Sequence, residues 1–333
     1  MAKAQTVLLI DPIADSKTPP LDLLRQATAL RHQGFEPEFR RGIPDESWPE
    51  PGQAIFTAVF SWHYSLLQSA IQAAKRLWPH AQLTLSGVLV RRMGPELGSL
   101  LGVSVLNASI EAALDELQPD YSIVPHWDAS ILVTSKGVCP RECAHCDASR
   151  RKKGVARIVA SWSNHLHPSL PRVEVWDNTL MLTPRDHYEK VANTLRLFER
   201  SVDFVCGIAP GGVPEEELLW RIGCLRGVRL SPVRLECNVT SDLDRFHRLL
   251  SSAQKTFPEC LDLRAFAVIN GYENPSEAWK RLEKIEATGL KVEPILFTPH
   301  EWFRTETYVH TVTGWTIQDI KAFQARWSTP YGN

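Results

Sequence analysis

The sequence predicts an α/β protein of two domains, and three observations lead to this class. The chain has 333 residues, 44% of them apolar, which is enough for two buried cores. Short apolar stretches alternate along it with stretches whose apolar residues recur at helical spacing. It contains neither a low-complexity segment nor a short-period repeat. This alternation is typical of parallel sheets with crossover helices, and we place the domains at 1–122 and 123–333.

The first domain is predicted to be doubly wound, with helices on both faces of a parallel sheet. Its strands are expected at 6–11, 36–39, 53–61 and 81–87. Its helices are expected at 19–34, 62–79 and 109–120, with a short turn at 96–102. The first of these helices has Pro near its start and Gly34 at its end, which is the usual arrangement at helix ends.

The second domain is predicted to be a partial α/β barrel. Its six strands are expected at 130–135, 172–177, 202–208, 232–238, 263–269 and 291–298. Helices are expected between them at 183–199, 214–225, 242–254 and 274–289, and the segment 308–327 is expected to form a turn and a capping helix. In such barrels the chemistry takes place at the carboxyl ends of the strands, so functional residues are expected there.

Charge and hydropathy narrow the possible partners. The net charge of −1 and the pI near 6.8 give no global basic field, so no bulk nucleic-acid binding is expected. No stretch approaches the roughly 18 apolar residues of a membrane helix, and the first residues lack the layout of a signal peptide. We therefore expect no membrane contact and a cytoplasmic location. In that reducing compartment, clustered cysteines indicate metal or catalytic ligands rather than disulfides.

Three of the seven cysteines, Cys139, Cys143 and Cys146, follow the first barrel strand in a C-x3-C-x2-C spacing. Three thiolates on a loop can converge on one centre, and they leave one coordination position of a four-iron cluster open. Structural zinc, with His145 or a distant histidine as the fourth ligand, is the alternative. Zinc modules usually pair two C-x2-C knuckles, and this sequence has no second pair, so we favour the cluster.

The stretch TSKGVCPRECAHC, followed by six alternating strands, resembles the radical S-adenosylmethionine (SAM) enzymes over about 128–300. The resemblance implies a [4Fe-4S] cluster on the three cysteines, with SAM chelating the open iron. It also implies reductive cleavage of SAM to a 5′-deoxyadenosyl radical that abstracts hydrogen from substrate, fed by a low-potential donor of flavodoxin or ferredoxin type. His145 takes the place of an aromatic residue whose backbone lies against the adenine. Val138 departs from the family pattern, since many members have Gly directly before the first Cys.

The same resemblance implies SAM contacts at other strand ends. Asp177 and Asn178, after the second strand, fit groups that accept from the SAM amino group, although a turn or a helix cap explains them equally well. Glu236 and Asn238, on one face of the fourth strand, fit groups that reach the ribose or carboxylate. Gly207, after the third strand, allows close ligand approach, but a simple loop also accounts for it.

Residues on the substrate side are harder to identify. His300, Glu301 and Arg304 follow the sixth strand and could face a substrate at the barrel mouth, although a solvated loop is the favoured interpretation. The sequence does not name the substrate. Peptide, nucleoside and lipid-like molecules all remain open.

The first domain resembles the Rossmann-like, cobalamin-binding domain of one radical SAM subclass in the order and spacing of its segments. The D-x-H-x-x-G signature whose His ligates cobalt is absent, and the expected glycine pair is reduced to Ser86-Gly87. Trp62 follows a strand and could lie against the lower face of a corrinoid. Because both signatures are degraded, we favour a domain that has kept this fold without cobalamin.

We therefore expect an enzyme that cleaves SAM at a [4Fe-4S] cluster. A cobalamin-dependent radical SAM methyltransferase is the first alternative. A non-catalytic protein that binds zinc or a cluster is the second.

Overall fold

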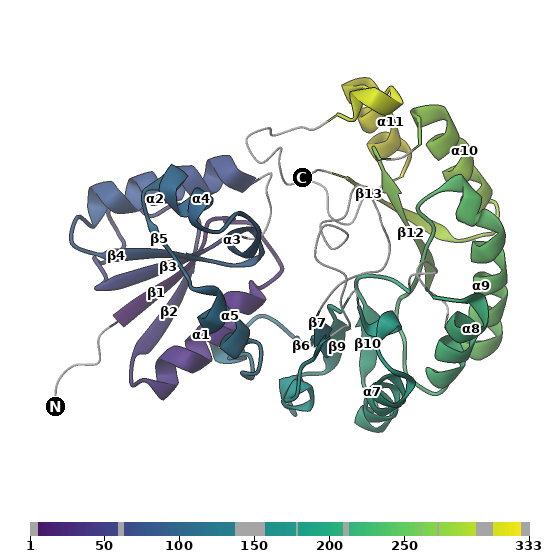
Figure 1. Cartoon of the computed structure of the whole chain (residues 1–333), viewed down its shortest axis with the longest axis horizontal. Helices are drawn as coiled ribbons and strands as arrows, with labels where there is room; N and C mark the ends of the chain where they lie inside the picture. Colours follow the sequence, from purple (N-terminus) through teal and green to yellow (C-terminus); the bar gives the residue numbers. More distant parts are fainter. Residues whose placement is uncertain are drawn as a thin grey trace. The chain divides into compact units, whose positions relative to one another are not determined.

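The structure, a computed structural model, describes residues 6–58, 63–136, 157–177, 179–208, 213–260, 262–271, 273–297 and 309–327. These residues form two compact units, which part between Asp128 and Ala129. Unit 1 contains the described residues up to Asp128, and unit 2 contains those from Ala129 onward (Figure 1). Both units combine parallel sheets with helices, so the predicted α/β class is confirmed.

Unit 1 is built on a parallel sheet of five strands in the order β2-β1-β3-β4-β5. The strands are β1 (Thr6–Asp11), β2 (Glu36–Arg41), β3 (Gln53–Thr57), β4 (Gln82–Ser86) and β5 (Ser104–Val105). The helices are α1 (Leu21–His32), α2 (Tyr64–Leu77), α3 (Val88–Met93), α4 (Pro95–Leu101) and α5 (Ala108–Leu114), followed by a 3-10 turn, η2 (Tyr121–Ile123). The strand order reverses between β1 and β3, which is where doubly wound sheets bind ligands.

Alternate residues of β1 face opposite sides of this sheet. Val7 and Leu9 pack in one cluster with Leu23 of α1, whereas Leu8 and Ile10 pack in another with α2. Helices therefore cover both faces, as the period-two pattern of a buried parallel strand requires.

The prediction of a short turn at 96–102 is wrong, because this segment is mostly α4 (Pro95–Leu101). Pro95 stands at the helix start and Leu97 and Leu101 bury one apolar face, four residues apart. The helix contains Gly98, and its missing side chain has a packing cause. A Cβ there would come within 2.8 Å of the Val103 carbonyl oxygen.

Unit 2 contains six parallel strands at the predicted places. They are β6 (Ala129–Leu132), β9 (Arg172–Val175), β10 (Ser201–Phe204), β11 (Val233–Glu236), β12 (Leu263–Ile269) and β13 (Lys291–Leu296). They form two sheets, ordered β10-β9-β6 and β11-β12-β13. Parallel bridges from Val202 to Leu230 and from Ile208 to Leu235 connect the two. The strands thus follow one another in chain order.

Helices α7 (Arg185–Phe198), α8 (Glu215–Cys224), α9 (Leu243–Thr256) and α10 (Pro275–Glu286) line one side of these strands (Figure 1). The side chains of Val202, Val233, Leu235 and Val292 belong to the core on that side. The chain continues into η7 (Thr311–Thr313) and the predicted capping helix, α11 (Ile317–Arg326). Three further 3-10 turns are η3 (Trp162–His165), η4 (Leu180–Leu182) and η5 (Thr240–Asp242). No helix in the described part of the chain has the length and apolar character needed to cross a bilayer.

Candidate functional site

The two ends of the cysteine segment, residues 137–156, are joined by a short antiparallel ladder. Ser135 and Lys136 form β7 and pair with Ile158 and Arg157 of β8. The ladder follows β6, so the segment departs from and returns to the carboxyl end of the first strand of unit 2. Cys139, Cys143, Cys146 and His145 themselves lie outside the described residues.

Asp177 follows β9 and is bonded to the start of this ladder. Its carboxylate accepts hydrogen bonds from the backbone N–H groups of Thr134, Ser135 and Thr179 at 3.0, 2.6 and 3.0 Å. The three hydroxyl groups of the same residues donate to it at 2.8, 2.8 and 3.1 Å. All four side chains are buried. Sequence reasoning singled out Asp177 but missed its partners, whose signal was the Thr-Ser pair at a strand end.

His187 of α7 contacts Thr134, one of the residues bonded to Asp177. Its Nε2 lies 3.2 Å from the Thr134 hydroxyl oxygen, and its ring meets Trp162 edge-on with centroids 6.0 Å apart. Burial lowers the pKa of His187, although the carboxylate of Asp177 acts in the opposite direction. Burial thus favours the neutral imidazole, which can form one hydrogen bond with the hydroxyl through Nε2.

Glu236 and Asn238 lie together at the carboxyl end of β11, although the strand ends at Glu236 and Asn238 follows it by two residues, outside the strand. Asn238 donates from Nδ2 to Glu236 Oε1 and accepts at Oδ1 from the Val268 N–H at 2.9 Å. Each residue is 9% exposed. Because the strands are parallel, these two residues and Asp177 occupy the same edge of the strands of unit 2.

Cys206 and Gly207 follow β10 at this edge. Cys206 was expected in a strand, but β10 ends at Phe204 and Cys206 lies in the following turn. Burial, with smaller effects from Asp177 and Glu236, raises the pKa of its thiol to about 12. Gly207 has φ +73°, which by itself favours glycine and accords with the loop interpretation. Among the described residues, no three His, Cys, Asp or Glu side chains gather as metal ligands would.

Ion pairs between strands occupy the sheet face below Glu236. Arg234 of β11 donates to Asp203 of β10 and, at 2.9 Å, to Glu293 of β13. Arg264 of β12 donates to Glu293 at 2.5 Å. Glu293 is fully buried, and its charge is met by both arginines. The charges of these side chains are therefore paired with one another, whereas Glu236 and Asn238 lie nearer the carboxyl ends of the strands.

Several predicted site residues fall outside the described residues. Asn178, Trp62, His300, Glu301 and Arg304 are in this group, and their roles stay predictions.

In unit 1, the Ser86-Gly87 pair lies at the carboxyl end of β4. The Ser86 hydroxyl accepts from Gln26 Nε2 at 2.5 Å. Gly87 has φ +107°, and a Cβ there would lie 2.7 Å from the Ala58 carbonyl oxygen. Close backbone packing thus accounts for this glycine. The nearby Thr57 hydroxyl donates to the carboxylate of Asp22 at 3.0 Å, so these polar groups are engaged with one another.

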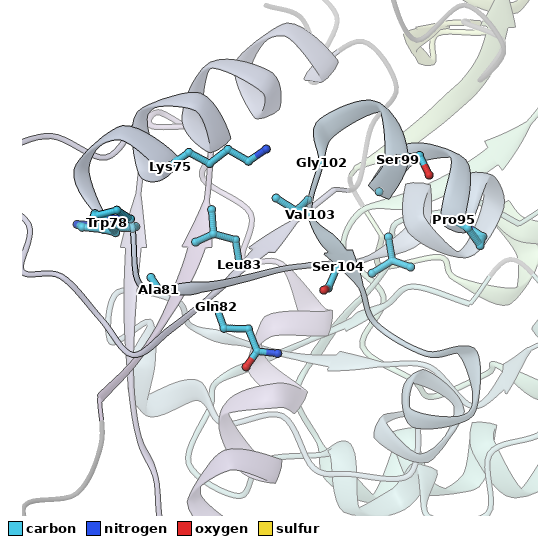
Figure 2. A pocket seen from close by; sticks show the side chains of 13 residues that line it. Lys75, Trp78, Ala81, Gln82, Leu83, Pro95, Ser99, Gly102, Val103 and Ser104 are labelled. Atoms are coloured by element: carbon cyan, nitrogen blue, oxygen red, sulfur yellow. The ribbon is translucent and has the colours of Figure 1, made fainter.

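Unit 1 also contains a pocket of about 740 Å³ beside β4 and β5 (Figure 2). Trp78, Gln82 and Val103 line it, and Lys75 donates across it from Nζ to the Leu101 carbonyl at 2.7 Å. Gln82 begins β4, so the pocket lies at the amino ends of the strands. Open parallel sheets bind ligands at the opposite, carboxyl edge, so this pocket does not belong to the candidate site.

Comparison with known proteins gives matches among solved structures. No protein-family model and no curated protein matches the sequence. The radical S-adenosylmethionine methyltransferase TsrM from Kitasatospora setae, solved with its tryptophan substrate and a SAM analogue, is similar with a TM-score of 0.64 and 13% identity. The match covers 89% of this chain and 75% of that one.

The cobalamin-dependent S-adenosylmethionine radical enzyme OxsB is similar with a TM-score of 0.53 and 12% identity. That match covers 97% of this chain but 61% of OxsB, so the chain spans less than two thirds of OxsB's length. At these identities the likeness concerns the fold. The predicted resemblance to radical SAM enzymes is confirmed at that level.

Proposed function

We propose that this chain is a radical SAM enzyme, with an N-terminal Rossmann-like domain and a partial (β/α)6 barrel. The observation that carries the proposal is the hydrogen-bonded base of the C-x3-C-x2-C segment at the carboxyl end of β6. This base, which we call the root of the segment, consists of Thr134, the ladder of β7 and β8, and Asp177. Glu236 and Asn238 lie at the same, carboxyl end of the parallel strands of unit 2, in the second of its two sheets. Three thiolates with an open fourth position suit a [4Fe-4S] cluster. When bound, the cluster supplies the electron that cleaves SAM to methionine and a 5′-deoxyadenosyl radical.

The residues of the chain divide the work of holding these groups. Cys139, Cys143 and Cys146 would hold the cluster. Glu236 and Asn238 present acceptor and donor atoms to the polar groups of SAM, and their mutual bond orients both side chains before SAM arrives. His145 would offer its backbone to the adenine, and Asn178 would accept from the SAM amino group.

The partners follow from this chemistry. The cluster needs an electron from a low-potential donor of flavodoxin or ferredoxin type. The substrate is a small molecule or a peptide, from which the radical removes a hydrogen atom. The buried ion pairs among Asp203, Arg234 and Glu293 close the sheet face below the site, and so limit the entry of water from that side.

The decisive experiment measures 5′-deoxyadenosine after anaerobic incubation of the reconstituted protein with SAM and dithionite. We expect the wild type and Cys224→Ala to form 5′-deoxyadenosine. Cys224 is the last residue of α8, away from the carboxyl ends of the strands. We expect no formation by Cys143→Ala. Cleavage that survives Cys143→Ala would make the cluster assignment wrong. Stoichiometric zinc without iron in the anaerobically purified protein would establish the non-catalytic alternative.

A cobalamin-dependent methyltransferase is the second candidate function. The fold likeness to the cobalamin-dependent enzyme OxsB favours it, because that likeness covers 97% of the chain and therefore includes unit 1. Against it stand the missing D-x-H-x-x-G signature and the engagement of Ser86 and Gly87 with Gln26 and Ala58. We therefore propose that unit 1 keeps its fold without cobalamin.

A further inference from the structure

We propose that Asp177 is a positioning residue that fixes the root of the cysteine segment, rather than an acceptor for the amino group of SAM. This inference rests on the proposed function, since it concerns the cluster that the segment would hold. It reassigns a carboxylate whose position after β9 suggests a ligand contact.

The first argument is the number of donors around the carboxylate. A carboxylate offers about four lone-pair positions. Three N–H and three O–H groups of Thr134, Ser135 and Thr179 already point at Asp177 within 3.1 Å. Asp177 is 7% exposed. A SAM ammonium would have to displace these donors, and each displaced group would lose its buried partner.

The second argument is the place of those donors in the chain. Thr134 gives its N–H to Asp177, while its carbonyl accepts from the Val159 N–H at 2.9 Å. Val159 directly follows β8, so Thr134 connects Asp177 to both arms of the ladder. Ser135 gives its N–H to Asp177 and begins β7. The carboxylate of Asp177 thus links the end of β9 to the β7–β8 ladder, at which the cysteine segment begins and ends.

The third argument is that the side chain at position 177 must be a hydrogen-bond acceptor at both of its terminal atoms. Two backbone N–H groups of neighbouring residues, Thr134 and Ser135, converge on the same oxygen. An amide in place of the carboxylate would keep one acceptor oxygen but turn an NH2 group toward other donors. His187 contacts the hydroxyl of Thr134 and so helps to hold Thr134 against Asp177. Mutation of a group that orients metal ligands typically lowers metal affinity by about 10- to 100-fold.

The experiment compares Asp177→Asn with Asp186→Asn, a matched change of an exposed residue at the start of α7. Each protein is reconstituted anaerobically, and iron retention is measured against a chelator. The electron paramagnetic resonance spectrum of the reduced cluster is then recorded before and after SAM is added. We expect Asp177→Asn to lower iron affinity by about 10- to 100-fold and to alter the spectrum before SAM is added. Asp186→Asn should match the wild type.

The opposite pattern would overturn the proposal. An Asp177→Asn protein with wild-type iron affinity and spectrum, in which SAM no longer changes the spectrum, would make Asp177 a SAM ligand. Ser135→Ala is the second variant in case Asp177→Asn does not fold, because it removes one hydroxyl donor and keeps the backbone N–H. It should lower iron affinity in the same direction, and an unchanged affinity would count against a positioning role.

Failure of the proposed function would appear in the metal content of the wild-type protein, not in the comparison of variants. A wild-type protein that holds zinc and no iron would disprove the radical SAM assignment before any variant is compared. The same variants would then be tested by the rate of zinc release. Faster release from Asp177→Asn than from Asp186→Asn would uphold the positioning role, and equal rates would refute it.

Discussion

At the carboxyl end of β1, the buried side chain of Asp11 holds its proton unusually tightly. Burial raises its pKa from 3.8 to about 6, although the Ile13 N–H and the nearby Arg41 act in the opposite direction. The folded chain therefore binds more protons than the unfolded chain between these two pH values. The contribution of Asp11 to the free energy of unfolding is most favourable below about pH 4 and is lost as the pH rises through about 6.

Asp11→Asn should stabilise the protein at pH 7.5, because an amide keeps the acceptor for Ile13 and has no charge to bury. A rise of about two pKa units corresponds to roughly 3 kcal/mol, and the advantage should shrink toward pH 4. Urea unfolding at the two pH values measures it. The exposed Asp15→Asn should leave stability unchanged at both. A pH-independent difference for Asp11→Asn would show that this carboxyl ionises equally easily in the folded and unfolded chain.

Residues whose partners are close in sequence could be predicted, and those with distant partners could not. Glu236 and Asn238 are bonded to each other and are only two residues apart, so their nearness could be predicted from the sequence. Asp177 meets Thr134 only because Leu132 of β6 pairs with Val175 of β9. That register depends on packing between segments about forty residues apart, which no local pattern contains.

At the scale of elements, the same distinction applies. The six parallel strands of unit 2 were predicted because apolar residues cluster in them or alternate with polar ones. The two-residue strands β5, β7 and β8 were not predicted, since two residues have no period and exist as strands only through their partners. The ladder that closes the cysteine segment belongs to this second kind, so the root of the candidate site could not be found from sequence.

Helix α11 shows how an element at the chain's end is held. Phe323 is 1% exposed, and its ring centroid lies 5.0 Å from those of Trp279 and Trp315 and 5.5 Å from that of Trp327. A capping box between Thr316 and Asp319 fixes the helix start.

Phe323→Ala should lower the free energy of unfolding by about 3–5 kcal/mol, because it leaves a cavity among three indole rings. Tryptophan fluorescence during urea unfolding measures it. Gln324→Ala, on the exposed side of the same helix, should change stability by less than about 0.5 kcal/mol. Equal effects of the two variants would mean that α11 is not packed in solution as the aromatic contacts indicate.

At the scale of the whole molecule, the residues that maintain a cobalamin-binding fold differ from the residues that would bind the cofactor. Unit 1 needs apolar residues on both faces of its sheet to keep its fold, and it has them. A corrinoid would need ligands and space at the carboxyl edge, where Ser86, Gln26, Asp22 and Thr57 bind one another. The fold and a cofactor site thus depend on different residues, so similarity of fold to OxsB does not decide the cofactor.

The cofactor can be decided on the full chain. Protein produced anaerobically with hydroxocobalamin supplied, then freed of unbound corrinoid by gel filtration, should have no corrinoid absorbance, because Ser86 is bonded to Gln26 and Gly87 packs closely on Ala58 in the described part of that edge. OxsB, a cobalamin-dependent enzyme, is the positive control under the same treatment. A stoichiometric corrinoid band would instead support the methyltransferase alternative. It would also require Gln26 to release Ser86, which a Gln26→Ala variant with tighter corrinoid binding would demonstrate.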